Sequence, residues 1–495
     1  MIAPGAWGNW QFKVESFTAN YTGGGAGTTR VKFATRSDGV IFGGWQEACG
    51  MHGAISDAAF YVEGVGLADL DSEREWHYDP STRALYVWPE NGTDLSASSS
   101  TLVAPQLLVM VDIRGQGTGS DTVAKSIEFV GLEFRDAMYS YFEAYEAHYS
   151  WGITRQGAVR MTNTTGASVR NCRFVALGGN AVFMNGSVTN SSVSGCECLL
   201  IGDSCIAAVG IANMADATGG LIASGNDISR NWMHDWGLWG KQTSGYTEIL
   251  SGANHIHHNV IYNGPRAGLN FNDNGVGGST AEYNLIFSQV LETGDHGPIN
   301  SWGADIWLWQ DRHKQLRLAP QTRTIRRNLI FSPCPSQLID HDDLSSEYLD
   351  EYNVLVGGGI KLRNGLNKIV DSNLVILSHD GLASFQVDGF DSEAVVNNTC
   401  VMDDKTNAYA WCTNGGGFPN VTTTAANTFI LPPQTPFHCD CGVAATNFTS
   451  WQASGADVGS RIAHLTPAET VSTVMGQARS MLGVSLTADR RSVIF

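Results

Sequence analysis

Charge is scarce in this chain, and positive charge is the scarcer sign. Charged residues make up 16% of the 495 positions, and 30 Lys and Arg stand against 48 Asp and Glu, which gives a formal net charge of −18. No Lys/Arg-rich run occurs, so we expect neither nucleic acid nor an anionic membrane surface as a partner. Because no apolar run reaches the ~18 residues that a transmembrane helix needs, no membrane insertion is expected.

Signatures of several other enzyme classes are also missing. There is no G-x-S-x-G nucleophile elbow, no Walker loop and no H-E-x-x-H metal motif. The opening residues MIAPGAWGNW lack the basic and apolar regions of a signal peptide, so we expect the numbering to begin at a processed or truncated end. The function has to be sought in a longer pattern.

Two weak features favour a secreted or cell-surface protein. The chain has 10 cysteines, and Cys400, Cys412, Cys439 and Cys441 are close together near its end, which is typical of an oxidising compartment. The second feature is a set of N-x-S/T sequons, which are potential glycosylation sites. These sequons lie at Asn20, Asn91, Asn163, Asn185, Asn190, Asn397, Asn420 and Asn447.

Glycine and a recurring segment are abundant. The 56 glycines follow no Gly-X-Y period and 43% of residues are apolar, which indicates a folded all-β protein with many tight corners. Short segments recur in which a small or amide residue is followed by apolar ones, as in ISRNWMH, IHHNVIY and IRRNLIF. The shared index position falls at Gly131, Asn171, Gly195, Asn231, Asn259, Asn284, Asn328, Asn353, Asn373 and Asn398.

The spacing of these segments predicts a parallel β-helix. Most neighbouring indices are 20 to 28 residues apart, which is about the length of one coil of three short strands. Leucine-rich repeats would need a Leu-x-x-Leu-x-Leu period, which is not seen. We expect the asparagines to stack inside, each bonding the backbone of the next coil. Cys172 and Cys196, which directly follow index residues, are expected to stack as a disulfide or as an apolar pair.

Three parts of the chain are predicted. Residues 1–120 are expected to form an N-terminal β-rich region, residues 121–440 the β-helix that carries the site, and residues 441–495 a C-terminal cap with a short helix. In the first part, EREWHYDPSTRALYVWP reads as a hairpin that turns at Asp79, Pro80 and Ser81.

The C-terminal helix is predicted from its start signal and its apolar spacing. Thr466 before Pro467 is typical of an N-cap and first turn. We expect this helix to pack on the last coil and to hide its open edge. The apolar residues at helical spacing are Ala468, Val471, Val474 and Met475.

Unusual polar residues recur at similar distances after the index asparagines. Because similar offsets on successive coils mean adjacent positions, they predict a wall of carboxylates and histidines on one outer face. Its expected members are Asn270, Asn272, Asp273, Asp295, His296, Asp340, His341, Asp342 and Asp343, with Lys241, Arg266, Lys361 and Arg363 beside them. The alternative is that these acids cap turns or bind a structural ion.

Such a wall suits a carbohydrate-processing site. Carboxylates on adjacent coils would be ~5 Å apart and those two coils apart ~10 Å, which brackets the separations of retaining and inverting glycosidases. We expect Asp295 and Asp342 or Asp273 to be the acid and the base or nucleophile, with His296 beside them. The expected substrate-binding residues are Arg266, Asn270, Asn272, Trp302, His341, Lys241 and Lys361.

No cofactor is required by this interpretation. Ca²⁺ is an alternative use of the acidic segment, with Asp340 and Asp343 as ligands near Asp342, because clustered hard oxygens suit it. Zinc is disfavoured, since His296 and His341 have no compact partners.

Tryptophans are dense near the same segments. Aromatic rings match the apolar face of a sugar. The expected sugar-stacking residues are Trp302, Trp307 and Trp309 on one side and Trp232, Trp236 and Trp239 on the other.

The chain resembles the right-handed parallel β-helix proteins of carbohydrate metabolism, the superfamily of pectate lyases and polygalacturonases. More narrowly, it is similar to a group of bacterial and algal candidate glycoside hydrolases. The matching segments are EREWHYDPSTRALYVWP, GLWGKQTSGY, NGPRAGLNFND, ETGDHGPINSW, IDHDD and VGGGIK. The resemblance implies a right-handed β-helix and an oligo- or polysaccharide partner. In that group NSW is commonly followed by Asp-Arg, whereas Gly303 and Ala304 follow Trp302 here.

Three functions stay open on the sequence alone. The first is a glycoside hydrolase. The second is a lyase or epimerase acting on uronic acids, with Lys241, Lys361 or Arg266 as the base and Ca²⁺ neutralising the carboxylate. The third is a non-catalytic glycan-binding or structural surface protein.

Overall fold

The computed structural model describes most of the chain. The described residues are 2–4, 9–19, 29–35, 62–64, 66–97, 101–143, 153–212, 218–272, 275–294, 296–303, 308–310, 315–318, 321–332, 337–377, 382–387, 393–402, 408–412, 422–439, 441 and 447–484. None of the helices in these ranges has the length and apolar character needed to span a bilayer.

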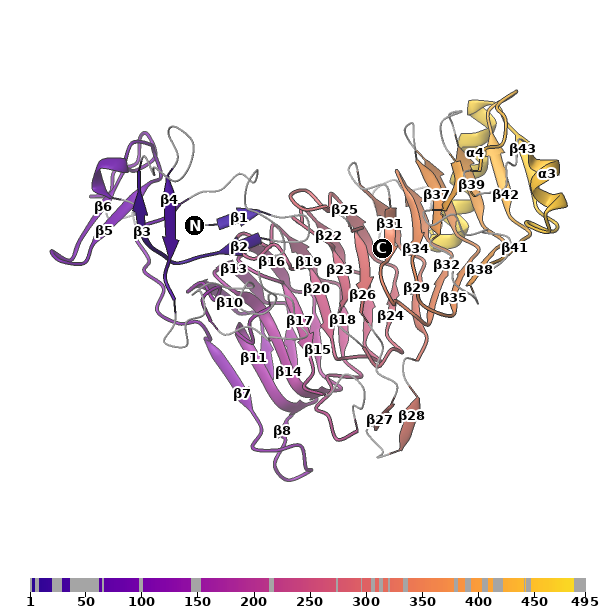
Figure 1. Cartoon of the computed structure of the whole chain (residues 1–495). Helices are drawn as coiled ribbons and strands as arrows, with labels where there is room; N and C mark the ends of the chain where they lie inside the picture. Colours follow the sequence, from indigo (N-terminus) through magenta and orange to yellow (C-terminus); the bar gives the residue numbers. More distant parts are fainter. Residues whose placement is uncertain are drawn as a thin grey trace.

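Three long parallel sheets wind around one core and form the β-helix predicted from the repeat (Figure 1). Each complete coil gives one strand to sheet I, then one to sheet II, then one to sheet III. Sheet I contains β7 (Val111–Arg114), β11 (Gly157–Thr165), β14 (Asn180–Thr189), β17 (Ile206–Val209), β20 (Tyr246–Ile249), β23 (Leu269–Asn272), β26 (Ile299–Trp302), β31 (Gln337–His341), β34 (Gly359–Leu362), β37 (Ala383–Val387) and β40 (Ala408–Cys412), and β8 (Ala124–Lys125) pairs with β11.

The other two sheets have the same parallel order. Sheet II contains β9 (Glu128–Val130), β12 (Ser168–Arg170), β15 (Ser192–Ser194), β18 (Asp227–Ser229), β21 (His255–His257), β24 (Thr280–Glu282), β29 (Arg323–Arg326), β32 (Tyr348–Glu351), β35 (Lys368–Asp371), β38 (Glu393–Val396) and β41 (Thr422–Ala425). Sheet III contains β10 (Glu133–Ala137), β13 (Arg173–Leu177), β16 (Glu197–Ile201), β19 (Trp232–His234), β22 (Val260–Tyr262), β25 (Leu285–Phe287), β30 (Leu329–Phe331), β33 (Val354–Val356), β36 (Leu374–Leu377), β39 (Thr399–Met402), β42 (Thr428–Leu431) and β43 (Arg461–His464).

An asparagine ladder runs along the corner between sheets II and III. At Asn328, for example, Nδ2 donates to the carbonyl of Ala281 and to Oδ1 of Asn353, while its own Oδ1 accepts from the backbone N–H and the side chain of Asn284. The predicted stacking is therefore confirmed. The same pattern joins Asn231, Asn259, Asn284, Asn328, Asn353, Asn373, Asn398 and Asn427.

The residue before each ladder asparagine has a left-handed backbone, as Arg230 (φ 55°) and His258 (φ 56°) do. Gly131, Asn171 and Gly195 also have positive φ. These three indices were therefore assigned one residue too early, because they take the left-handed place before the ladder.

In the two coils before Asn231, the ladder position belongs to cysteine. The backbone N–H of Cys172 donates to Sγ of Cys196, and the N–H of Cys196 donates to Oδ1 of Asn231. Both cysteines are buried and free, so they stack without a disulfide. A disulfide joins Cys412 and Cys441 near the end of the solenoid.

The predicted N-terminal hairpin is confirmed as β5 (Trp76–Asp79) and β6 (Ala84–Val87). The carboxylate of Asp79 accepts hydrogen bonds from Ser81 and Thr82, which lowers its pKa to about 2 and closes the turn. Other antiparallel pairs are β1 (Ile2–Pro4) with β2 (Asn9–Gln11), β3 (Val14–Thr18) with β4 (Arg30–Phe33), and β27 (Leu308–Gln310) with β28 (Leu316–Leu318), and η2 (Leu67–Asp69) is a short 3₁₀ turn.

The predicted C-terminal helix is confirmed as α4 (Pro467–Leu482), which has a capping box between Thr466 and Glu469. Its packed face differs from the prediction, because Val474, Ala478, Met481 and Leu482 contact the outer face of sheet III. The predicted members Val471 and Met475 are exposed, and Ala468 also faces solvent.

The last coil is closed chiefly by α3 (Phe448–Ala453), which lies at the far end of the solenoid (Figure 1). Its Trp451 is fully buried against Tyr409 and Phe437. The open edge is thus covered by a helix that was not predicted, while α4 covers the side of sheet III.

Candidate functional site

A row of polar side chains lies on the outer face of sheet I, where four neighbouring strands are in register. Asn270 pairs with Asn300, Asn300 with Asp340, and Asp340 with Lys361. Successive strands in a sheet are ~4.8 Å apart. We call these four residues the sheet I row.

Strand alternation explains why the row points away from the core. On β23, Leu269 and Phe271 belong to the hydrophobic core, so Asn270 and Asn272 lie on the opposite face. Nδ2 of Asn300 donates to Oδ1 of Asn270 at 3.0 Å and to Oδ1 of Asn272 at 3.1 Å. The predicted residues Asn270 and Asn272 therefore share one amide network with Asn300, which was not among the predicted residues.

Beside the amides is a compact cluster of opposite charges. Nζ of Lys361 lies 3.1 Å from Oδ1 of Asp340 and 3.0 Å from Oδ1 of Asp342. Arg363 contacts Asp342 at 3.1 Å and Asp343 at 2.9 Å. We call these five residues the acid–base cluster.

Burial and charge act against each other at Lys361. Burial alone would lower its pKa, but the carboxylates of Asp340 and Asp342 outweigh this effect and raise the pKa above its ordinary value. Lys361 therefore stays protonated and holds two carboxylates close together. Because it carries its proton, it serves as an electrostatic partner and not as a free base at neutral pH.

The corner before the sheet I strands contains three further predicted residues. Arg266 and His296 are 4% and 5% exposed. Nε2 of His296 lies 2.6 Å from Oγ1 of Thr293. Lys241 contacts Glu292 at 2.8 Å and the carbonyl of Gly237 at 2.7 Å, so it belongs to this corner and not to the outer face of sheet I.

Another buried carboxyl, which was not predicted, lies at a corner of the same kind. Asp203 follows β16 and is 5% exposed. Burial raises its pKa to about 7, and hydrogen bonds from Thr243 and from the backbone of Ser204 oppose this only in part. A single aspartate in a turn carries no sequence signal that would distinguish it.

His341 does not lie on the outer face of sheet I, where the sequence predicts it. Its side chain is fully buried in the interior, with Nδ1 2.9 Å from Oγ of Ser301 and Nε2 2.7 Å from Asp350. The reason is the two-residue period of a strand: Asp340 points outward, so the next residue must point inward. The Ser301–His341–Asp350 arrangement is sealed in the core.

The predicted tryptophan wall is only partly present. Trp302 ends β26 and is half-buried, on the row's side of sheet I. Trp236 is buried in the core, and Trp232 is exposed on β19 of sheet III, so neither lines the outer face of sheet I. Trp239 is half-buried in a corner loop, where its carbonyl accepts from Asn9.

Some predicted residues lie outside the described part of the chain. These are Asp273, Asp295, Trp307, Asn20 and Asn420, and the side chain of Trp309 is likewise not described. Among the described sequons, Asn91, Asn190, Asn397 and Asn447 are exposed, while Asn163 and Asn185 are half-buried. Glycosylation stays a prediction at all of them.

Calcium also stays a prediction. Asp340 and Asp343, the two proposed ligands, are engaged by Lys361 and Arg363 respectively. A calcium ion would have to compete with both cations for these oxygens.

Comparison with known proteins agrees with this architecture. Residues 142–315 match a family model described as the right handed beta helix region. The fold is a right-handed parallel β-helix. No curated protein matches the chain.

Among solved structures that resemble the chain, one has a similar fold. One, named "Glycoside hydrolase", is 14% identical, with a TM-score of 0.55 over 72% of this chain and 64% of that one, so this chain spans less than two thirds of its length. DFA-IIIase from Arthrobacter chlorophenolicus A6 in complex with GF2 is 11% identical (TM-score 0.31, 57% and 66% coverage). A mutant of the PL6 family alginate lyase AlyGC is 13% identical (TM-score 0.31, 73% and 51% coverage).

Proposed function

We propose that the protein is a carbohydrate-active enzyme that hydrolyses a glycosidic bond in an oligosaccharide or polysaccharide. The observation that carries this proposal is the sheet I row together with the acid–base cluster. Carboxylates, amides and an ammonium group share one outer face on neighbouring coils. Fold likeness to a glycoside hydrolase agrees with this chemistry.

The sheet I row, Trp302 and the acid–base cluster each have a role in this proposal. The amides of Asn270 and Asn300 match sugar hydroxyls, which both donate and accept hydrogen bonds. Trp302 offers an aromatic face for a sugar ring. Asp342, held by Lys361 and Arg363, serves as the carboxylate that acts as base or nucleophile.

The second carboxyl in the proposal is Asp295, with Asp273 as the alternative. A glycosidase needs a protonated acid beside an ionised carboxylate, and Asp295 immediately precedes the buried His296 in the sequence. Secretion or display at the cell surface fits a polysaccharide substrate and is part of the proposal. No cofactor is needed for this reaction.

A reducing-sugar assay on a panel of glycans tests the proposal. We expect Asp342→Asn and Asp295→Asn each to lower kcat by about 10²- to 10⁴-fold, the usual contribution of an acid–base group. The matched control is Asp371→Asn, because Asp371 lies on sheet II and accepts only local side-chain hydrogen bonds among those described. Unchanged hydrolysis in both site variants would remove these assignments.

Elimination is the second candidate, because Lys361 and Arg363 place two cations on the same outer face, where a uronic acid carboxylate could bind. A lyase or epimerase of this kind would use a base from the acid–base cluster. Products that absorb in the ultraviolet would indicate cleavage by elimination in place of hydrolysis. Glycan binding without turnover in a folded sample would favour a non-catalytic surface protein.

A further inference from the structure

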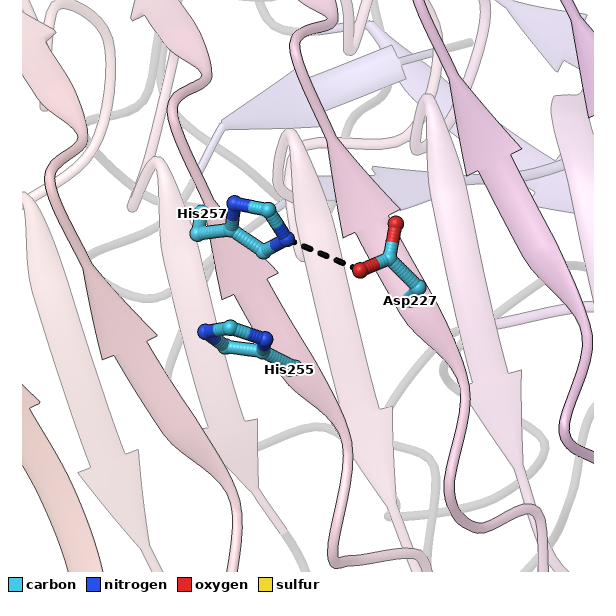
Figure 2. A group of neighbouring side chains, drawn as sticks. All are labelled: Asp227, His255 and His257. Atoms are coloured by element: carbon cyan, nitrogen blue, oxygen red, sulfur yellow. Dashed lines mark hydrogen bonds and ion pairs between the residues drawn. The ribbon is translucent and has the colours of Figure 1, made fainter.

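A second polar cluster lies on another face of the solenoid, on the outer side of sheet II. Asp227 on β18 faces His255 and His257 on the neighbouring strand β21 (Figure 2). One ligand atom from each of the three side chains can be chosen so that all lie within 4.8 Å of one another. The ring of His257 points at the carboxylate of Asp227, and its Nε2 is 2.8 Å from Oδ2 (Figure 2).

Strand geometry brings these three residues together. His255 and His257 are two positions apart on one strand, so both side chains leave the same face, while Ile256 between them is buried in the core. Asp227 pairs in register with His255, and Ser229 pairs with His257. The result is one carboxylate and two imidazoles from two adjacent coils.

We propose that Asp227, His255 and His257 bind a divalent transition metal ion, with zinc as the expected metal. Two imidazole nitrogens and one carboxylate oxygen are a preferred ligand set for zinc. The two histidine rings stack with centroids 4.0 Å apart, which places the two imidazoles side by side. Small side-chain rotations bring three atoms that start within 4.8 Å to zinc-binding distances of ~2.0–2.2 Å from one centre.

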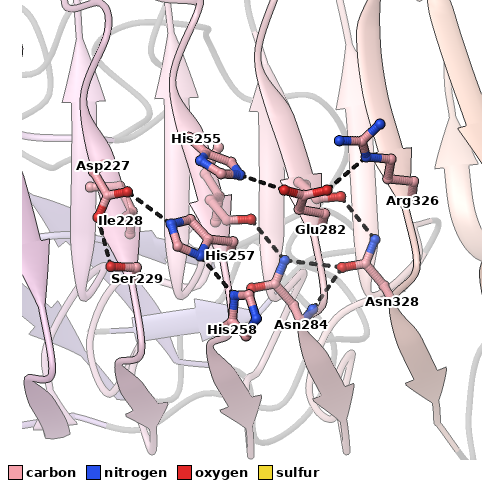
Figure 3. A network of polar contacts seen from close by, with 12 residues as sticks. Asp227, Ile228, Ser229, His255, His257, His258, Glu282, Asn284, Arg326 and Asn328 are labelled. Carbon is pink, nitrogen blue, oxygen red and sulfur yellow. Dashed lines mark hydrogen bonds and ion pairs between the residues drawn. The ribbon is translucent and has the colours of Figure 1, made fainter. Parts of the chain in front are cut away.

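The surrounding contacts already orient the ligands, as a metal site requires (Figure 3). Nδ1 of His257 lies 2.7 Å from Nδ1 of His258, so a partner is in place for the nitrogen that would not bind the metal. Nε2 of His255 lies 2.8 Å from Glu282, which is itself held by Arg326 at 2.7 Å. When Nε2 of His255 donates to Glu282, Nδ1 is the ring nitrogen left to bind the metal.

The carboxylate is oriented in the same way. Oγ of Ser229 donates to Oδ1 of Asp227 at 2.6 Å, which leaves Oδ2 directed at His257. Every proposed ligand therefore has a fixed partner on the atom that the metal would not use. Three protein ligands leave the fourth position of a tetrahedral ion to water or to an incoming ligand.

This site is independent of the proposed hydrolysis, because it lies on sheet II and the acid–base cluster lies on sheet I. A bound ion would tie β18 to β21 across two coils, and would stabilise the folded chain in proportion to its occupancy. Loss of metal binding and loss of hydrolysis can thus be measured separately in the same variants.

Zinc titration of the chelator-stripped full chain, against a competing chromophoric chelator, tests the proposal. We expect the wild type to bind zinc at this site, and Asp227→Asn, His255→Ala and His257→Ala each to weaken binding by about 100-fold or more, while His258→Asn weakens it by about 10-fold. Asn suits the left-handed backbone of position 258 (φ 56°). His464→Ala, an exposed histidine on β43, is the matched control and should bind as the wild type does.

Two further measurements keep the test decisive. Substitution with Co²⁺ should give visible d–d absorption in the wild type and in the control, but not in the His255→Ala/His257→Ala double variant. Zinc should raise the thermal midpoints of the wild type and of His464→Ala but not that of the double variant, and the metal-free midpoints should match if the variants fold. A wild type that binds no zinc, or a double variant that binds it equally well, would overturn the proposal.

Discussion

Lys368 and Glu393 form an ion pair of 2.8 Å inside the solenoid, and neither side chain is exposed. The pair lies on the strands β35 and β38, at the start of each. We expect Lys368→Met to destabilise the fold by about 3–5 kcal/mol, because it leaves a buried carboxylate without its cation. The double variant Lys368→Met/Glu393→Leu should recover most of this loss. Urea denaturation of the three proteins measures it, and equal losses in the single and double variants would contradict the pair's role.

The asparagine ladder should be sensitive to a single interruption. Asn328→Ala removes the acceptor of the Asn284 backbone N–H and the donor to Ala281, so we expect a loss of about 2–4 kcal/mol from the unpaired buried groups. Asn91→Ala, at an exposed turn, should change stability by less than about 0.5 kcal/mol. Thermal and urea midpoints compare them. A loss no larger than that of the control would show that the ladder is dispensable at this coil.

Asp203 should make stability depend on pH. Its folded-state pKa of about 7 is above the ordinary 3.8, so between these values the folded protein holds a proton that the unfolded chain has lost. The stability contributed by the protonated Asp203 carboxyl is fully present below about pH 4 and is lost as the pH rises through about 7. Asp203→Asn should therefore gain stability relative to the wild type at pH 8, by at most about 4 kcal/mol, and much less at pH 5. Urea midpoints at both pH values check it, and a difference that does not change with pH would disprove the raised pKa.

Lys361 should control the charge state of the acid–base cluster. Lys361→Met leaves the carboxylates of Asp340 and Asp342 facing each other without the cation between them, which removes the electrostatic stabilisation of both. We expect kcat/KM to fall by about 100-fold or more and the acidic limb of the pH–rate profile to move to higher pH. Gln386→Met is the matched control, since Gln386 pairs with Lys361 in register on β37. A lower rate with an unmoved acidic limb would indicate a structural effect only.

The two faces of α4 should respond differently to charge. Val474→Asp places a carboxylate against the apolar residues of sheet III and should cost about 2 kcal/mol or more, because a charge is moved from water into an apolar contact. Val471 is 62% exposed, so Val471→Asp should cost less than about 0.5 kcal/mol. Thermal unfolding distinguishes them. Equal effects would place α4 differently on the solenoid.

The fold could be predicted because its strongest determinant is local and repeated. Asn259, Asn284 and Asn353 are followed by apolar residues that fill the core, and the buried amide must be satisfied in every coil, so the same short segment returns. Where Cys172 and Cys196 replace asparagine, the signal disappears and the index moves by one residue. That error did not matter for the fold, because the ladder from Asn231 onward was assigned correctly.

The site was harder to predict, because corners between sheets III and I differ in length. The partner of Asn270 in the row is Asn300, and not residue 295 or 296, since the segment between β25 and β26 is longer than that between β22 and β23. Counting from the ladder therefore placed His296 on the outer face, whereas it lies buried in the corner. At His341 the error was a single residue, and one residue reverses the face of a strand.

The cluster on sheet II was missed for a different reason. HIHH was treated as part of a repeating core segment, although His255 and His257 alternate with the buried Ile256. Alternation within one strand indicates a shared outer face, but the facing Asp227 comes from the previous coil. Only the register between the two strands joins them.

In every described coil, the strand of sheet II is joined to that of sheet III by two residues, whereas the other two corners vary from two residues to long excursions such as the one that contains β27 and β28. The corner that carries the asparagine ladder thus keeps a constant length from coil to coil, while the other two corners can lengthen. Insertions in related chains can therefore change the loops beside the outer face of sheet I without changing how the coils stack. We therefore expect their length differences to fall at those corners and the two-residue hinge to keep its length.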